Sequence, residues 1–196
     1  EKSNGEVVYQ QLEANIAKTG IPRAIVGDHG TDLKSGVERF CQTHPETCFI
    51  YDIKHKTVAV LKHTLEHDET WMAFTRLAAQ TKRRVQQTAL AALAPPNQRT
   101  KARYMNVDVM IQWGQNILTF LDRQQAGHIT PFDPEQIQEK LAWVTQFRQS
   151  LTEWTQLLQL VTVTENFVRQ QGLYHHAHLD LKERLLPLAQ TDQAKK

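Results

Sequence analysis

The sequence predicts an α/β unit at the N-terminus followed by a longer, mostly helical part, so that the fold is α-rich overall. Two short apolar runs, at residues 24–26 and 48–51, are typical of buried strands, and each is followed by an aspartate. The segment between them has helical spacing and is long enough to connect a parallel pair. After Asp52 the apolar spacing becomes helical and stays so through most of the chain.

The composition is typical of a globular protein. The chain has 196 residues, of which 40% are hydrophobic and 22% charged, and its formal net charge is +2. Because this charge is small, only local basic clusters can argue for nucleic acid. Cys41 and Cys48 are the only cysteines, which predicts a reducing compartment and no disulfide framework. No apolar run approaches the roughly 20 residues that cross a bilayer, so we expect no membrane partner.

The first two helices are predicted from their start and stop signals. Ser3 and Glu6 have the spacing of a capping box, and Gly20 ends the helix that follows. Thr31 is expected to cap the second helix, which ends before Pro45.

The parallel order predicts where the two aspartates lie. The carboxyl ends of parallel strands meet at one edge of a sheet, so Asp28 and Asp52 should be neighbours there. Two strands do not form a stable sheet alone, so at least one further strand is expected from outside this sequence.

The helical part is divided by prolines and glycines. The Pro-Pro pair at 95–96 is the clearest break, and a helix is expected over about residues 97–122. Asp133 is a strong helix start, the following long helix is expected to end at Gly172, and a last helix is expected over residues 179–186. One apolar stripe is interpreted as core rather than as a base-stacking platform. It consists of Trp143, Phe147, Leu151, Trp154, Leu158 and Val161.

These patterns predict three regions. The α/β unit covers residues 1–66, the helical part covers residues 67–190, and a polar tail at 191–196 is expected to be frayed. The chain begins at Glu1 rather than at a methionine, which favours a piece of a longer protein.

Residues 25–33 are the most informative stretch for chemistry. They read as a strand, an aspartate, a glycine turn and a helix start. An aspartate at this place can hold a divalent metal, because Mg²⁺ prefers one or two carboxylates together with waters and phosphate oxygens. The simpler interpretation is a turn in which Asp28 accepts hydrogen bonds from nearby backbone N–H groups, and the bare pattern favours it.

The run Asp28-His29-Gly30-Thr31 resembles the second acidic motif of the DDE transposases and retroviral-type integrases, which have an RNase H-like fold. That motif is a strand followed by Asp, a polar residue, Gly, and Ser or Thr. The match is position by position.

Residues 21–56 further resemble the Mutator-like transposases and related families. Pro45, Cys48 and His55 stand in comparable places, although the cysteine and the histidine are usually closer together. A long all-helical insertion after the second strand is also a feature of several of these families. Beyond the first third of the chain, the resemblance is one of architecture only.

The resemblance implies a partial RNase H-like domain interrupted by an all-helical insertion, and it implies a function. The intact enzyme would cleave and transfer DNA strands at transposon ends with Mg²⁺ or Mn²⁺. It would act as a homo-oligomer, in the cytoplasm and on the nucleoid if the source is bacterial. Asp28 would be a catalytic metal ligand, whereas Glu165 and Glu183 bear no mark of a site. The first and third acidic residues are expected outside this sequence, so the chain alone should be inactive.

Two basic clusters are candidates for DNA binding, through contacts with phosphates. For either cluster alone, a solvated helix face is the more common explanation. The candidate residues are Lys82, Arg83, Arg84, Arg99, Lys101 and Arg103.

Asp52, His55 and Lys56 have two interpretations. One is a helix cap with solvated basic residues behind it, and the other is DNA contact or support near the metal edge. Cys48 is expected to be buried.

Two sets of possible metal ligands are assigned no site. The set Cys41, His44, Cys48 and His55 matches no standard zinc spacing. The set His175, His176 and His178 should diverge on a helix and lie at the surface.

Two alternatives stay open. A non-catalytic helical interaction module would be favoured if the flanking sequence lacked acidic residues at strand and helix positions. Another α/β metal-dependent phosphohydrolase would also place aspartates at strand ends, but it would need an acidic strand end close to the N-terminus.

Overall fold

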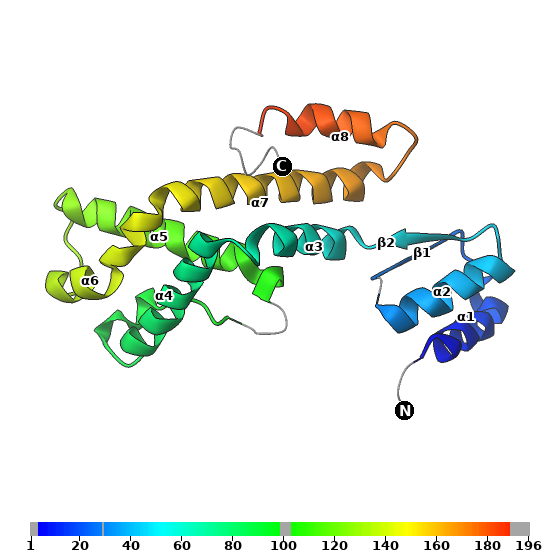
Figure 1. The fold of residues 1–196 in the computed structure, drawn as a ribbon, viewed down its shortest axis with the longest axis horizontal. Helices are drawn as coiled ribbons and strands as arrows, with labels where there is room; N and C mark the ends of the chain where they lie inside the picture. Colours follow the sequence, from blue (N-terminus) through cyan, green and yellow to red (C-terminus); the bar gives the residue numbers. More distant parts are fainter. Residues whose placement is uncertain (1–3, 29, 99–102, 189–196) are drawn as a thin grey trace. The chain divides into compact units, whose positions relative to one another are not determined.

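The computed structural model describes residues 4–28, 30–98 and 103–188, and the chain divides into two compact units, Glu1–Thr57 and Val58–Lys196. Helices predominate in the described residues and the sheet is small (Figure 1). The division falls within helix α3 (Ile53–Leu65), whereas the sequence patterns placed it after residue 66. The tail at 191–196 lies outside the described residues.

Helix α1 (Gly5–Thr19) opens the N-terminal unit. Its cap is Asn4, whose side chain accepts a hydrogen bond from the Val7 N–H at 3.0 Å. The capping box predicted at Ser3 is therefore wrong by one residue: the Asn4 carboxamide satisfies one of the open N–H groups of the first turn. The helix ends as predicted at Gly20, whose φ of 74° lies in the left-handed region that favours glycine.

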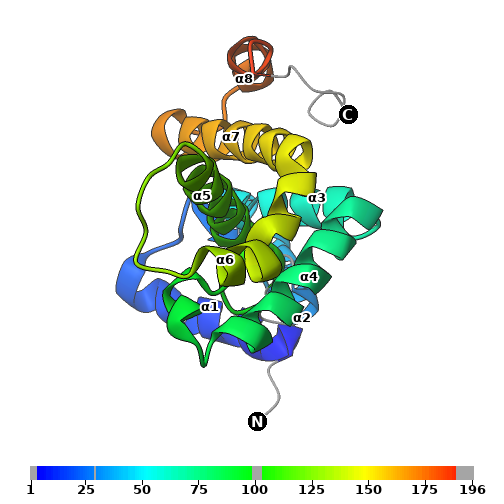
Figure 2. The ribbon, with the colours of Figure 1, turned by 90° about the vertical axis from the view of Figure 1, so that its left-hand side faces the viewer.

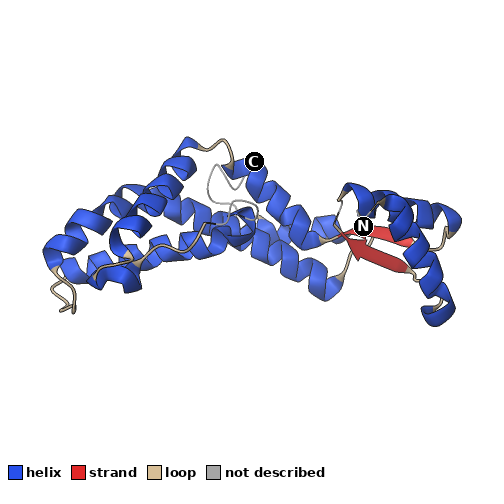
Figure 3. Ribbon diagram, turned by 90° about the horizontal axis from the view of Figure 1, so that it is seen from below, coloured by secondary structure: helices blue, strands red, loops and turns tan. Residues whose placement is uncertain are grey.

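Strands β1 (Ala24–Gly27) and β2 (Cys48–Tyr51) confirm the predicted parallel pair, with helix α2 (Thr31–Thr43) as the connection (Figure 3). Their burial was predicted wrongly. Val26 is 66% exposed and Cys48 is also exposed. Alternate side chains of a strand point to opposite faces, and helix α2 packs against the sheet on one of them. Within the described part of this unit, the other face has no covering layer, so apolar residues there meet solvent.

Helices α1 and α2 pack unusually closely because Gly36 has no side chain. A Cβ at Gly36 would lie 2.5 Å from the Val8 Cβ and 2.6 Å from the Gly5 carbonyl oxygen. Beside this crossing, Val37 and Phe40 are completely buried. The close approach therefore builds the small core of a unit whose sheet has only two described strands.

The helical unit begins within helix α3, at Val58. It contains helices α4 (Glu69–Val85), α5 (Val107–Gln125), α6 (Pro134–Leu141), α7 (Arg148–Gln171) and α8 (Ala177–Leu185), and the short 3₁₀ helices η1 (Ala89–Leu93), η2 (Arg103–Asn106) and η3 (Ala142–Phe147). Helix α8 folds back beside α7 (Figures 1 and 2). The predicted helix start at Asp133 and the predicted helix end at Gly172 are confirmed.

The helix predicted over residues 97–122 begins later, at Val107. One contact contributes to this difference. The Gln98 side chain donates to the Thr75 carbonyl oxygen at 2.6 Å, which fastens this segment to α4.

The core of the helical unit is centred on Phe74, which is completely buried. All four tryptophans of the chain have ring centroids within about 6 Å of the Phe74 ring. They are Trp71 at 6.0 Å, Trp113 at 6.1 Å, Trp143 at 5.7 Å and Trp154 at 5.4 Å. One aromatic cluster thus joins α4, α5, η3 and α7.

Close packing and an ion pair hold helices α5 and α7 together. A Cβ at Gly114 would come within 2.6 Å of a Leu151 methyl group, so the glycine lets the helices approach. At the surface, Arg148 donates to both carboxylate oxygens of Asp122, at 2.9 and 2.6 Å. These hydrogen bonds from Arg148 lower the pKa of Asp122. Because the pair is exposed, apolar packing dominates.

The predicted apolar stripe is core in its central part. Phe147, Leu151 and Trp154 are buried, whereas Trp143, Leu158 and Val161 are half-buried. The difference at Trp143 has a geometric cause. This residue lies in η3, whose three residues per turn shift it away from the α-helical stripe of α7.

We predict that Trp154→Ala lowers the free energy of unfolding by about 3–5 kcal/mol, because a completely buried indole is replaced by a cavity. Trp154→Phe should cost less, since the indole N–H meets no acceptor among the described residues and its removal relieves that penalty. Urea denaturation measures both. Gln159→Ala, at an exposed position of the same helix, is the control and should change stability by no more than about 0.5 kcal/mol. An equal effect of Trp154→Ala and Gln159→Ala would show that the stripe is not core.

Candidate functional site

The candidate site lies where the two parallel strands end. Gly27 pairs with Tyr51, and the Asp52 N–H donates to the Gly27 carbonyl oxygen at 2.8 Å, which continues the ladder by one residue. Asp28 and Asp52 therefore follow neighbouring strands at the same edge of the sheet. This arrangement confirms the predicted edge geometry.

Asp28 forms the turn between β1 and α2. One carboxylate oxygen, Oδ1, accepts a hydrogen bond from the Gly30 N–H at 3.1 Å. Thr31 is the first residue of α2 and not its cap, since Gly30 occupies the cap position without a side-chain hydrogen bond. The Asp28 carboxylate, rather than a Thr31 side-chain cap, therefore stabilises the turn that leads into α2. Its second oxygen, Oδ2, is turned toward His55.

Asp52 acts as the predicted helix cap and also contacts His55, while DNA contact or support of a metal stays a prediction. Its Oδ1 accepts from the Lys54 N–H at 3.0 Å, at the start of helix α3. Its Oδ2 lies 2.7 Å from His55 Nδ1. The same carboxylate therefore satisfies a backbone donor of the helix start and fixes the imidazole ring.

His55 joins the two aspartates, and we call Asp28, Asp52 and His55 the aspartate–histidine edge. Its other ring nitrogen, Nε2, lies 3.8 Å from Asp28 Oδ2. The three side chains are between one third and one half exposed, so solvent and a bound ligand can reach them. Sequence reasoning named all three residues but not the bridge. The three-residue spacing of Asp52 and His55, which puts them on one face of the first helical turn, is the signal that could have found it.

The aspartate–histidine edge does not form a complete metal site by itself. Within residues 4–28, 30–98 and 103–188, no group of three or more His, Cys, Asp or Glu side chains is arranged to hold an ion. Asp52 faces donors with both oxygens. The side chain of Asp28, the predicted ligand, is nearly half exposed, so an ion could bind its Oδ2, and this fits a hard cation that keeps several waters.

Only one of the two basic clusters can be placed. Lys82, Arg83 and Arg84 form the last turn of α4, where positive charge also complements the helix dipole. Arg84 pairs with Glu139 and Lys82 donates to Asn97, so both side chains already have protein partners. Arg83 is exposed.

The side chains of the second basic cluster cannot be placed. Arg99 and Lys101 lie outside the described residues, and the Arg103 side chain is not described. The DNA-binding role of all six residues stays a prediction.

The two cysteines differ in how exposed they are. Cys48, expected to be buried, is exposed because it lies on the uncovered face of β2. Partial burial, with the nearby Cys48 and Glu38 as further causes, raises the pKa of the Cys41 thiol.

His44 forms a hydrogen bond with Glu13 on α1 through Nε2 at 2.9 Å, which gives this ring a structural role. His175, His176 and His178 are exposed, as predicted. The expected divergence is wrong for the first two, which lie in the turn before α8 with ring centroids 4.4 Å apart.

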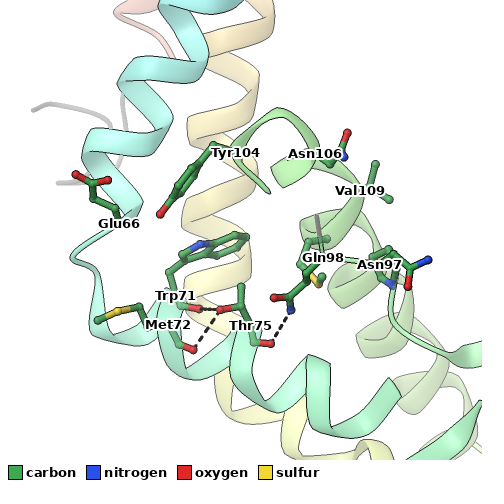
Figure 4. Close-up of a pocket in the computed structure, with 11 residues that line it drawn as sticks. Glu66, Trp71, Met72, Thr75, Asn97, Gln98, Tyr104, Asn106 and Val109 are labelled. Carbon is green, nitrogen blue, oxygen red and sulfur yellow. Dashed lines mark hydrogen bonds between the residues drawn. The ribbon is translucent and has the colours of Figure 1, made fainter. Parts of the chain in front are cut away.

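A pocket in the helical unit is a second candidate site that sequence reasoning missed (Figure 4). Its volume is about 320 Å³. Trp71 and Tyr104 form aromatic walls, and Gln98 is fixed at its rim by the hydrogen bond to Thr75. The remaining lining residues are Glu66, Met72, Pro96, Asn97, Asn106, Val109 and Met110. Such a mixture of apolar walls and a few polar groups is typical of small-ligand pockets.

We predict that Asp52→Ala lowers the free energy of unfolding of the N-terminal unit by about 0.5–2 kcal/mol, the usual cost of losing a side-chain cap. Asp52→Asn keeps an acceptor for the Lys54 N–H and should cost clearly less. Chemical denaturation followed by NMR signals of residues in β1 and β2 measures both. If Asp52→Ala and Asp52→Asn are equally stable, the carboxylate does not stabilise the start of α3.

Comparisons with known proteins do not assign this chain to a family. A scan against protein-family models and searches of curated proteins and of solved structures find no match. None of the described helices has the length and apolar character that crossing a membrane requires.

Proposed function

We propose that this chain is a piece of a DDE-type transposase catalytic domain, which cleaves and joins DNA phosphodiester bonds with divalent metal ions. The main support is the position of Asp28. It directly follows a strand of a parallel pair, beside Asp52, with its side chain nearly half exposed at the edge where such sheets place their sites. The Asp28-His29-Gly30-Thr31 motif supplies the link to this class, and a partial RNase H-like fold is part of the proposal.

In this proposal, Asp28 is the metal ligand and the aspartate–histidine edge keeps it in place. The Gly30 N–H holds Asp28 Oδ1, so that Oδ2 stays directed outward from the turn. Bound Mg²⁺ or Mn²⁺ would stabilise charge on the attacking and leaving oxygens of the phosphodiester. A complete site needs further carboxylates, which we propose are supplied by parts of the protein beyond these residues.

DNA would be bound by phosphate contacts from Lys82, Arg83 and Arg84 on α4, together with Arg99, Lys101 and Arg103. Such contacts give affinity without sequence choice, so recognition of transposon ends would need other parts of the enzyme. We further propose a homo-oligomeric enzyme that acts in the cytoplasm, on the nucleoid in a bacterial cell.

A second candidate is a non-catalytic helical interaction module. The pocket beside Trp71 and Tyr104 favours it, because a preformed pocket whose described lining holds Glu66 as its single carboxylate suits binding rather than phosphodiester chemistry. The two candidates differ in their dependence on Asp28. Only the transposase requires that carboxylate for its activity.

We predict that Asp28→Asn in the full-length parent abolishes strand cleavage and transfer while DNA binding changes by less than about twofold, because the substitution removes a metal ligand and leaves the basic clusters intact. A strand-cleavage assay with Mg²⁺ or Mn²⁺ measures the activity, and a filter-binding assay measures the affinity. Asp32→Asn, an exposed carboxylate four residues away, is the matched control and should keep activity. Full activity of Asp28→Asn would disprove the proposed function.

The 196-residue chain alone should show no metal-dependent cleavage in the same assay. Cleavage that Asp28→Asn removes would mean that a complete site lies within the chain.

We predict weak, salt-sensitive DNA binding by the chain. Changing both Lys82 and Arg83 to glutamine should reduce the slope of log affinity against log salt by about 2, since two fewer counterions are released. Fluorescence anisotropy with a labelled duplex at several salt concentrations measures this slope. Lys182→Gln on exposed α8 is the control. Identical slopes for the wild type and the double variant would exclude this end of α4 from the DNA interface.

A further inference from the structure

The hydrogen bond between Asp52 and His55 determines which nitrogen of the imidazole carries the proton. A carboxylate only accepts hydrogen bonds, so at the 2.7 Å distance between Asp52 Oδ2 and His55 Nδ1 the nitrogen must be the donor. A neutral imidazole has a single N–H. Nε2 of His55 is then left with a lone pair and can act as a ligand.

A second electron-pair donor lies close to this nitrogen. His55 Nε2 and Asp28 Oδ2 are 3.8 Å apart, which is too far for a hydrogen bond. The orientation of Asp28 is fixed as well, because Gly30 holds its other oxygen. Two ligand atoms each about 2.1 Å from one ion lie roughly 3.0–3.4 Å apart at octahedral or tetrahedral angles, so a shift of less than about 1 Å between these side chains lets a single cation contact both.

We propose that Asp28 Oδ2 and His55 Nε2 together hold one divalent transition-metal ion, with Asp52 as a positioning residue for His55. This inference rests on the proposed function, because it adds a ligand to the metal site expected at Asp28. A metal-bound histidine commonly donates its other N–H to a carboxylate, which fixes the ring and makes it a better ligand. The Asp52–His55 pair supplies this arrangement before any ion is bound.

A nitrogen ligand changes which ions the site prefers. Mg²⁺ binds oxygen ligands, whereas imidazole is better matched to later transition metals, and affinity rises from Mn²⁺ to Co²⁺ at a given nitrogen and oxygen site. The expected order of affinity is therefore Co²⁺, then Mn²⁺, then Mg²⁺. Because Asp28 and His55 are nearly half exposed, water would complete the coordination.

The competing explanation is an ion pair in which a charged His55 links the two carboxylates without any metal. In that case His55 contributes only to the local electrostatics of the edge. The two explanations differ in one measurable way, since only the metal site makes Co²⁺ affinity depend on His55 more strongly than Mg²⁺ affinity does.

The test is titration of the 196-residue chain with Co²⁺, Mn²⁺ and Mg²⁺ by calorimetry, with cobalt also followed by visible absorption. His55→Gln should lower Co²⁺ affinity at least tenfold and Mg²⁺ affinity by less than threefold. Asp52→Asn should lower Co²⁺ affinity by a smaller factor, and Asp28→Asn should abolish binding of all three ions. His63→Gln, an exposed histidine on the same helix, is the matched control and should leave every affinity unchanged.

A second measurement uses the wild-type protein, so it does not depend on whether the variants fold. Traces of Mn²⁺ added to the wild type should selectively broaden the His55 imidazole signals in an NMR spectrum. Broadening of other histidines without His55 would overturn the inference, as would unchanged Co²⁺ affinity in His55→Gln. If Asp28→Asn still loses binding in that case, the metal role of Asp28 in the proposed function survives. If neither variant affects binding, both ideas fail for this edge, and the parent cleavage assay then judges the proposed function separately.

Discussion

The candidate site depends on the hydrogen bond from the Asp52 N–H to the Gly27 carbonyl oxygen. This bond extends the parallel ladder past the last strand residues, so Asp28 and Asp52 leave the sheet side by side. Each aspartate then uses one oxygen to start the helix that follows, through the Gly30 N–H or the Lys54 N–H. The edge is thus built by ordinary turn and capping interactions, and the two remaining carboxylate oxygens are left facing His55.

Most of the fold could be predicted from the sequence because its signals are local. Gly20, Asp133 and Gly172 begin or end helices as expected, and the parallel order followed from the length of the connection between the two strands. The errors arose where distant contacts override local preference. The segment at Asn97 has no helix because Gln98 is bonded to α4, and Cys48 is exposed because a neighbouring layer over its face is absent among the described residues.

The site was predictable in part. The strand-end rule placed Asp28 and Asp52 together, since it depends only on strand order. The bridge through His55 depends on side-chain rotamers, which sequence spacing permits but does not specify. The pocket beside Trp71 was not predictable at all, because Tyr104, which lines it with Trp71, lies 33 positions further along the chain.

The aromatic cluster around Phe74 has a practical consequence. All four tryptophans belong to the helical unit, and none occurs before residue 58. Intrinsic tryptophan fluorescence therefore reports the unfolding of the helical unit alone, whereas far-ultraviolet circular dichroism reports helices of both units. Coincident transitions by the two methods would indicate that the units unfold cooperatively, and separate transitions would give each unit its own stability. The tryptophans thus serve as an intrinsic fluorescent probe of the helical unit and need no chemical modification.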